Sequence, residues 1–599
     1  MSLETPVETL AELLERRAGD DRPGLLFEDR VWSWREYIAE CRARAAWMDT
    51  RSATARAGGG TGEAADGSVT GGATGETGHG APESGAPESG APESGAPESG
   101  ALHVGVLFDN VPELLFLLGG AALSGHVVVA LNPTRGAAEL ARDADATDVD
   151  VILHDAAYAG LAAQVAALRS AAAGPPGSGR VPRPGPGQEG DGGRRDRAAR
   201  TGPGDLVMLI FTSGTSGRPR AVRVTQRKVA VPGTNLAALL SPVDVVYCAM
   251  PLFHSGAVMA AYAPAVASGA ALVLRRRFSA SGLMDDVRRY GVTYLHYVGK
   301  ALSYVLATPE TPADRDNTLK IAFGNEGSAT ATRRFGERFG CHVIDAFGST
   351  ETAIAITPDP AGPPGCLGRL PDGVEIRDPA TGERRPPGII EDGRLVNGDE
   401  SIGELVNTRG LGLFDGYYND PEADRERIRD GAFWSGDMAY ADADGYVFFA
   451  GRGTERLRVD GENLAVAPIE AAVREFPGVV EAAVYPVPDA AAGDQVMTAL
   501  VTSDGWDAER AGAFAAFLEQ RTDLSRKAIP RYVRLSTELP QTPSHKVVKR
   551  LLVAEAWRTG DPVWWCPPRE RRWRRLTPDD AGQIEHEFVQ HGREHLLER

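Results

Sequence analysis

Short apolar runs alternate with amphipathic stretches along much of the chain, which is the pattern of a layered α/β protein with a parallel sheet. Between residues 293 and 347 the pattern predicts strand 293–298, a helix to Ala307, strand 319–323, helix 330–339 and strand 342–347. Ligands usually gather at the carboxyl ends of such strands. The hydroxyl-rich run 212–217 and the run 347–351 both follow predicted strands, so both stand where ligands bind.

After about residue 450 the pattern changes to a smaller, mixed unit. We expect helix 468–476, strands 479–487 and 496–502, helix 508–521 and strand 532–537. The last segment has the pattern of an appended tail, in which Trp564 and Trp565 are packing anchors. The predicted domains are therefore 1–450, 451–560 and the tail 561–599.

Two segments lack the large apolar residues that a core requires. Residues 51–100 are rich in Gly, Ala, Thr and Ser, and residues 173–204 are rich in Pro, Gly and Arg. We expect both to be disordered insertions, because they cannot bury enough surface to offset the entropy of ordering. The apolar run 114–130 contains glycines and a β-branched run, which predicts a buried helix, a turn and a buried strand rather than a membrane span.

The charge and cysteine content indicate which binding partners and which cellular compartment are expected. The 599 residues carry 64 Lys and Arg against 82 Asp and Glu, a net charge of −18, which argues against nucleic acid as a partner. We expect no integral membrane span and leave peripheral membrane association open. Five widely spaced cysteines and a start without a basic or apolar leader favour a cytoplasmic protein.

The run 209–220 carries the most informative chemistry. Its glycines allow backbone amides to turn toward an anion, its hydroxyls add donors, and Arg218 and Arg220 add positive charge. The run differs from a Walker loop because residues 221–225 read as a second strand rather than a helix. Taken alone, the run fits either a phosphate-binding loop or a hydroxyl-rich surface hairpin.

Four short motifs occur in one order: residues 211–220, residues 347–351, residues 435–437 with 451–452, and residues 539–546. Together they closely resemble the adenylate-forming acyl-CoA synthetase superfamily, over nearly the whole chain outside the insertions and the tail. Residues 297–304, 324–326 and 459–463 look like its fatty-acid branch, which includes actinobacterial fatty-acid CoA ligases and fatty-acid transport proteins.

The resemblance implies a fold and an activity. It implies a large N-terminal domain of layered parallel α/β sheets with a small β-barrel-like subdomain, and a smaller, mobile α+β C-terminal domain. It also implies a ligase that joins a carboxylic acid to ATP with release of pyrophosphate, and then transfers the acyl group to coenzyme A with the help of Mg²⁺. Attack of a carboxylate on the α-phosphate brings two anions together, so such a site must neutralise charge.

The resemblance also implies roles for individual residues. The β and γ phosphates of ATP would bind to the loop of Thr212, Ser213, Gly214, Thr215, Ser216, Gly217 and Arg220. The adenine side would be lined by Gly324, Asn325, Glu326, Phe347 and Gly348. The remaining assignments are Thr350 to the α-phosphate, Glu351 to Mg²⁺, Asp437 and Arg452 to the ribose, Gly461 to the path of the pantetheine arm, His254 to the acyl entrance, and Lys546 to the reacting carboxylate and α-phosphate.

Several positions depart from the family pattern. Arg220 replaces the usual lysine, Phe347 the usual tyrosine, and His545 the usual glycine before the catalytic lysine; the hinge falls near Thr454. His254 stands where amino-acid-activating relatives carry an aspartate, which argues against an amino-acid substrate. Three alternatives stay open: loading of a carrier protein, activation of an aromatic or polyketide-derived acid, and a degenerate member that binds nucleotide or lipid.

Overall fold

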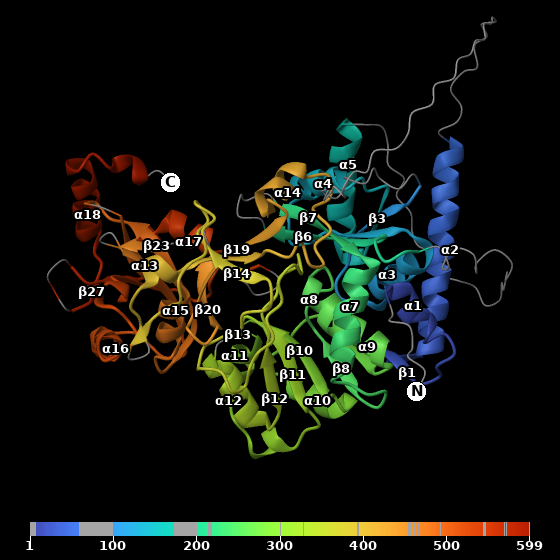
Figure 1. The fold of residues 1–599 in the computed structure, drawn as a ribbon, viewed down its shortest axis with the longest axis horizontal. Coiled ribbons are helices and arrows are strands. Elements are labelled where there is room, and N and C mark those ends of the chain that lie inside the picture. The colour runs from blue at the N-terminus through green and yellow to red at the C-terminus, as the bar shows by residue number, and fades with distance from the viewer. Residues whose placement is uncertain are drawn as a thin grey trace, which may run out of the picture.

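The structure is a computed structural model of the full chain. It describes residues 8–58, 100–172, 201–213, 219–299, 301–327, 329–391, 394–452, 457–459, 462–464, 466–491, 493–542, 547–567, 570 and 572–597. Figure 1 shows a large domain and, beside it, a smaller domain drawn in orange to red that is formed by the C-terminal part of the chain.

The largest sheet has seven strands in the order β12-β11-β10-β8-β9-β1-β2. All neighbours are parallel except the edge hairpin of β1 and β2. The strands are β1 (Pro23–Phe27), β2 (Arg30–Ser33), β8 (Val245–Cys248), β9 (Ala271–Leu274), β10 (Tyr294–Val298), β11 (Ile321–Asn325) and β12 (His342–Asp345). The predicted parallel sheet is therefore confirmed.

A second sheet repeats this plan with five strands in the order β5-β3-β4-β6-β7. Only the edge hairpin of β6 and β7 is antiparallel. The strands are β3 (His103–Leu107), β4 (Val127–Ala130), β5 (Val151–His154), β6 (Leu206–Ser213) and β7 (Pro219–Thr225). Val104 and Val128 of this sheet belong to the same hydrophobic core as Val246 and Leu272 of the seven-stranded sheet, so the two sheets share one packed interior.

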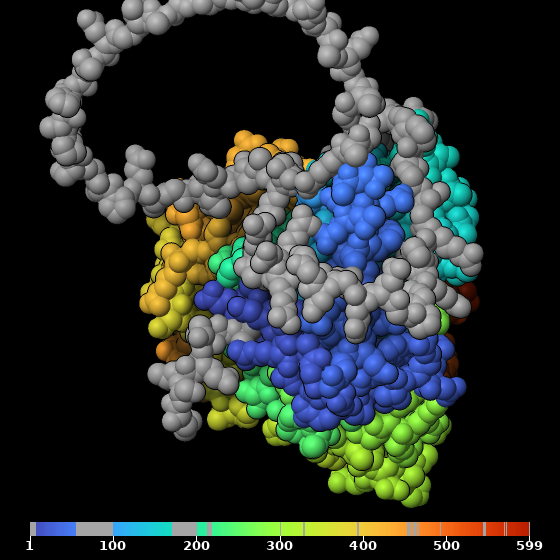
Figure 2. All heavy atoms as spheres, turned by 90° about the vertical axis from the view of Figure 1, so that its right-hand side faces the viewer, coloured from blue at the N-terminus to red at the C-terminus, as the bar shows by residue number. Residues whose placement is uncertain are grey.

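Helices pack around and between these sheets. They are α1 (Leu10–Glu15), α2 (Trp34–Gly58), α3 (Pro112–Ser124), α4 (Ala137–Ala146), α5 (Ala159–Ala172), α7 (Gln226–Ala237), α8 (Ser255–Ala257), α9 (Ala263–Ser268), α10 (Leu283–Tyr290), α11 (Ala301–Leu306) and α12 (Ala329–Phe339). The N-terminal residues (blue) form much of the face that lies opposite the small domain (Figure 2).

The expected barrel-like subdomain is an antiparallel sheet of six strands. Its strands are β13 (Gly368–Arg369), β14 (Val374–Arg377), β17 (Gly403–Asn407), β18 (Ile428–Arg429), β19 (Ala432–Ala441) and β20 (Tyr446–Arg452). The same region holds the hairpin β15 (Ile390–Glu391) and β16 (Arg394–Leu395) and the helices α13 (Gly398–Ser401) and α14 (Pro421–Arg427).

The small domain is an α+β unit, as predicted. A five-stranded sheet in the order β23-β24-β25-β26-β27 accompanies the hairpin of β21 and β22. The elements are β21 (Leu457–Val459), β22 (Glu462–Leu464), β23 (Val479–Pro488), β24 (Asp494–Thr502), β25 (Tyr532–Leu535), β26 (Val563–Trp565), β27 (Arg574–Arg575), α15 (Val466–Arg474), α16 (Ala508–Glu519), α17 (Lys549–Glu555) and α18 (Pro578–Gln590). Because β26 and β27 extend this sheet, the expected tail contributes to the small domain rather than standing apart from it.

Three other local expectations can be compared with the structure. Residues 114–130 form α3, a left-handed turn at Gly125 (φ 71°) and β4, as the pattern predicts. Among the described residues, no helix is long and apolar enough to span a membrane. The expectation of disorder is wrong for residues 51–58, which continue α2, while 59–99 and 173–200 lie outside the described residues.

Candidate active site

The hydroxyl-rich run connects the antiparallel strands β6 and β7, so its predicted position between two strands is confirmed. In this hairpin Thr212 lies opposite Arg220, and Ser213 lies opposite Pro219. The residues that join the two ends lie outside the described residues: Gly214, Thr215, Ser216, Gly217 and Arg218. Their role as a phosphate-binding loop stays a prediction, and the hairpin places that loop directly after the carboxyl end of β6.

Arg220 is buried and already has an acidic partner. It forms an ion pair with Glu426 of α14, a residue 206 positions further along the chain. Its guanidinium carbon also lies 5.5 Å from the ring centroid of Tyr417. The predicted contact of Arg220 with phosphate stays a prediction, and the guanidinium is oriented by groups that the local sequence does not indicate.

Glu351 accepts a hydrogen bond of 2.9 Å from the Tyr417 hydroxyl. Tyr417 is held against the strand that follows the hydroxyl-rich run, because it pairs with Val222 in an isolated β-bridge. The Arg223 amide donates to the Gly416 carbonyl over 3.1 Å beside it. Tyr417 therefore links the predicted Mg²⁺ ligand to the hairpin of the predicted phosphate loop.

Thr350 is buried, and its hydroxyl lies 2.9 Å from the hydroxyl of Ser255. Ser255 begins α8 and directly follows His254, so the structure brings the predicted acyl-entrance residue next to the predicted α-phosphate contact. Burial, and secondarily His254, lower the pKa of His296 to about 3, so this neighbouring imidazole is neutral at physiological pH. This corner of the site thus combines hydroxyls with at least one neutral imidazole.

The carboxyl ends of β10, β11 and β12 meet beside this corner. The carboxylate of Asp345 accepts a hydrogen bond from the Tyr297 hydroxyl and another from the Gly327 amide, each of 2.7 Å. A Cβ at Gly324 would lie 2.1 Å from the Tyr297 carbonyl oxygen, so only glycine fits there. The buried Asn325 Oδ1 has no hydrogen-bond partner among the described residues, as expected of an acceptor kept for a ligand.

The other residues predicted on the adenine side lie on the same loops. Glu326 is exposed and has a left-handed backbone (φ 60°), a conformation that costs energy for a residue with a side chain. The Phe347 ring packs with its centroid 6.2 Å from that of Phe449. Gly348 is exposed, and a Cβ there would meet no atom within 4 Å. The Phe347 ring is therefore held by packing, whereas Gly348 borders open space.

Asp437 and Arg452 are backbone partners on neighbouring strands. They are paired in the antiparallel register of β19 and β20, and the Asp437 side chain is buried. The Ser435 hydroxyl accepts a hydrogen bond of 3.1 Å from the Asp437 amide, which fixes the backbone of β19 just before the carboxylate. The predicted ribose pair is thus adjacent in the backbone, while Gly461 and Lys546 lie outside the described residues.

Comparison with known proteins agrees with this geometry. Residues 99–418 match the sequence model of the AMP-binding enzyme family, and residues 468–546 match that of the AMP-binding enzyme C-terminal domain. The chain belongs to the AMP-binding enzyme family. The two matches lie within the large and the small domain respectively.

Relatives of this AMP-binding enzyme align over most of its length. The medium/long-chain-fatty-acid CoA ligase FadD17 of Mycobacterium tuberculosis is 43% identical over 93% of this chain and 98% of its own. A steroid-22-oyl-CoA synthetase of Rhodococcus jostii is 39% identical over 98% of this chain and 99% of its own. The crystal structure of ATP-bound MatB from Rhodopseudomonas palustris has the same fold, with a TM-score of 0.67 at 21% identity over 91% of this chain and 98% of its own.

Sequence reasoning missed Lys228, a fully buried lysine in α7. Its ammonium has no hydrogen-bond partner within the part of the chain that the structure describes, and it lies 5.6 Å from the ring centroid of Phe414. Burial lowers the pKa of Lys228 to about 8, and the charges of Asp415 and Glu351 oppose that change. A signal existed in the sequence, because Lys228 directly precedes the apolar pair Val229 and Ala230, shortly after the predicted strand 221–225.

Proposed function

We propose that this AMP-binding enzyme is an acid-thiol ligase that activates a medium- or long-chain fatty acid as acyl-AMP and then forms acyl-CoA. The proposal rests above all on one observation: Glu351 is held by Tyr417, which is fixed to the strand leaving the predicted phosphate loop. This arrangement brings a carboxylate for a hard cation close to the segment that would hold the phosphates of ATP. The similarity to a ligase of medium- and long-chain fatty acids supports the choice of acid.

The residues present fit a nucleotide with its metal ion. Glu351 offers carboxylate oxygens to Mg²⁺, and Asn325 Oδ1, which has no partner among the described residues, offers an acceptor to an amino group such as that of adenine. Asp437 has the chemistry to accept both ribose hydroxyl protons, and Arg452 to donate to the same sugar. Bound Mg²⁺ would neutralise phosphate charge. Thr350, held by Ser255, would orient the α-phosphate toward the attacking carboxylate.

The second half-reaction would use the other face of the small domain. Gly461 would leave room for the pantetheine arm of coenzyme A, and the small domain would rotate about a hinge near Thr454 between the two half-reactions. Lys546 would serve only the first of them.

The substrate assignment is tested by acid-dependent exchange of pyrophosphate into ATP, followed by consumption of coenzyme A. We expect exchange with octanoate and palmitate to exceed exchange with acetate, benzoate and a steroid-22-oic acid. Leucine is the matched negative control, because His254 replaces the acidic partner of a substrate ammonium. Absence of exchange with every acid would refute the enzyme assignment, and exchange without consumption of coenzyme A would favour a carrier protein as the acceptor.

The role of Glu351 is tested through its partner. Tyr417→Phe removes one donor from the Glu351 carboxylate, so we expect the Mg²⁺ concentration for half-maximal exchange to rise about three- to tenfold, with little change at saturating Mg²⁺. The matched control is Tyr418→Phe, because the Tyr418 hydroxyl donates over 2.9 Å to Asp148 instead. Equal Mg²⁺ titrations for the two variants would contradict the assignment.

A further inference from the structure

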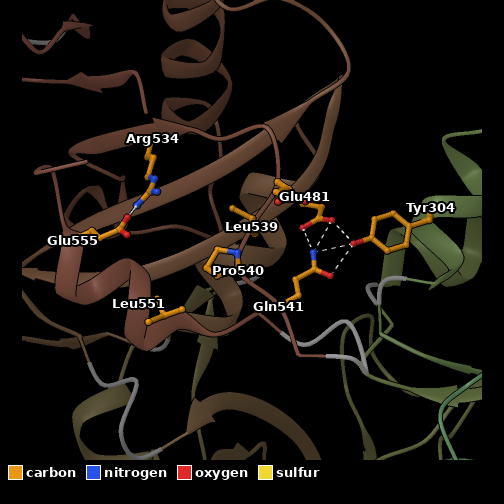
Figure 3. Close-up of a pocket in the computed structure, with 9 residues that line it drawn as sticks. Tyr304, Glu481, Arg534, Leu539, Pro540, Gln541, Leu551 and Glu555 are labelled. Carbon is orange, nitrogen blue, oxygen red and sulfur yellow. Dashed lines mark hydrogen bonds and ion pairs between the residues drawn. The ribbon is translucent and has the colours of Figure 1, made fainter. Parts of the chain in front are cut away.

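A pocket of about 670 Å³ lies where the two domains meet, and its lining includes Tyr304 of α11 from the large domain. The lining of the small domain includes Glu481 of β23, Gln541, Arg534 of β25 and Glu555 of α17. Figure 3 shows the Tyr304 ring reaching from the large domain (green ribbon) to Glu481 and Gln541. Tyr304, the last residue of the sequence motif 297–304, has no role in the function proposed above.

Three side chains in this pocket form a closed set of hydrogen bonds, which we name the cross-domain clasp: Tyr304, Glu481 and Gln541. The Tyr304 hydroxyl donates to the Glu481 carboxylate. Gln541 Nε2 donates to Glu481 Oε2 over 2.8 Å and to the Tyr304 hydroxyl oxygen over 3.0 Å. Each member of the clasp thus contacts the other two.

The buried carboxylate of Glu481 is the group that accepts hydrogen bonds from both other members of the clasp. Glu481 is only 5% exposed, and a buried carboxylate requires hydrogen-bond donors. Gln541, which donates to this carboxylate, belongs to the small domain, as Glu481 does. Tyr304, the other donor in the clasp, belongs to the large domain. Burial, and next the hydrogen bond to Glu481, raise the pKa of Tyr304, so its hydroxyl keeps the proton that it donates. The orientation of the small domain that includes Tyr304 is therefore favoured over any that separates them.

Gln541 connects the clasp to the segment of the predicted catalytic lysine. Gln541 pairs with Val547 in an antiparallel β-bridge, and the Val548 amide donates to the Pro540 carbonyl over 2.7 Å. The chain on both sides of residues 543–546 is thereby held together, and Lys546 is the residue immediately before Val547. A contact that holds Gln541 against the large domain therefore also holds its partner Val547, the residue that follows Lys546, in place.

We propose that Tyr304 is a positioning residue for acyl-adenylate formation. Through the clasp it holds the small domain in the orientation that presents Lys546 to the large domain, and the clasp must open before the transfer of the acyl group to coenzyme A. This inference rests on the proposed function, because it assigns Lys546 to the first half-reaction only.

The test measures the two half-reactions separately in the full chain. For Tyr304→Phe we expect kcat of acid-dependent exchange of pyrophosphate into ATP to fall about tenfold, with KM for ATP unchanged. Formation of acyl-CoA from preformed acyl-AMP should be unchanged or faster, because the clasp no longer holds the domain in the first orientation. The matched control is Tyr290→Phe, which removes a hydroxyl that donates over 3.0 Å to the Glu28 carbonyl, far from the small domain.

A second variant separates positioning from general damage. Glu481→Gln keeps the shape of the clasp but removes its charge. We therefore expect Tyr304→Phe to lower the exchange rate less in the Glu481→Gln protein than in the unaltered protein, and we expect this difference in the exchange reaction alone. Equal losses in both half-reactions, or an exchange rate in Tyr304→Phe equal to that of Tyr290→Phe, would overturn the inference. The proposed function fails in a different way, since the unaltered enzyme would then show no exchange with any acid.

Discussion

Replacement of Lys546 by alanine is expected to lower the rate of acyl-adenylate formation by on the order of 10²–10³, and to leave the transfer of the acyl group from preformed acyl-AMP to coenzyme A intact. The reason is electrostatic. A carboxylate that attacks the α-phosphate brings two anions together, and an ammonium that touches both stabilises the charge as the bond forms. The second half-reaction has no such meeting of anions.

The measurement is acid-dependent exchange of pyrophosphate into ATP, set against acyl-CoA formation from supplied acyl-AMP. Arg550→Ala is the control, because it removes an exposed positive charge four residues away from Lys546. Equal losses of both half-reactions in Lys546→Ala would refute the assignment. An exchange rate equal to that of Arg550→Ala would refute it as well.

Much of the architecture could be predicted because it is encoded locally. Buried parallel strands are apolar in nearly every position, so strand β3 and the buried run 114–130 stand out from their surroundings. The motifs also stand where strands end, which is where the structure places Thr350 and Asn325. Local pattern was misleading at 51–58, where residues without large apolar side chains still continue a helix that begins at Trp34.

What the sequence did not reveal depends on partners far apart in the chain. Glu426 binds Arg220 across 206 positions, and Tyr417 binds Glu351 across 66. No periodicity links such residues, because their proximity arises only when the loop after β17 folds back along β7. The β26 and β27 strands were missed for a related reason, since short strands at the end of a chain are recognisable only from the sheet edge that they join.

Lys228→Met is expected to stabilise the protein at pH 7 by up to roughly 3 kcal/mol, although it removes a charged group beside the site. Burial lowers the pKa of Lys228 from 10.5 to about 8, so the native state holds this proton less firmly than the unfolded chain does. At about 1.4 kcal/mol for each tenfold change in affinity, that drop corresponds to roughly 3 kcal/mol. Loss of the contact with Phe414 offsets part of the gain.

The pH dependence distinguishes this cause from better packing. Below pH 8 both states carry the proton, and the native state bears the full cost of a buried ammonium. Between pH 8 and pH 10.5 the unfolded chain binds more protons at this site, so the stability of the unaltered protein should rise with pH relative to that of Lys228→Met. Urea unfolding midpoints at pH 7, 8.5 and 10 measure the difference, and Lys228→Arg is the control that stays charged throughout.

The same variants test whether the destabilising Lys228 ammonium contributes to the binding of ATP. The field of Lys228 reaches Glu351 and Asp415, so its removal should weaken the hold of the site on the phosphates of ATP. We therefore expect Lys228→Met to be more stable yet to have a KM for ATP that is about tenfold higher, whereas Lys228→Arg retains the affinity. A Lys228→Met protein that is less stable than the unaltered protein at pH 7 would show that the ammonium is stabilised by a partner, and that its burial carries no cost.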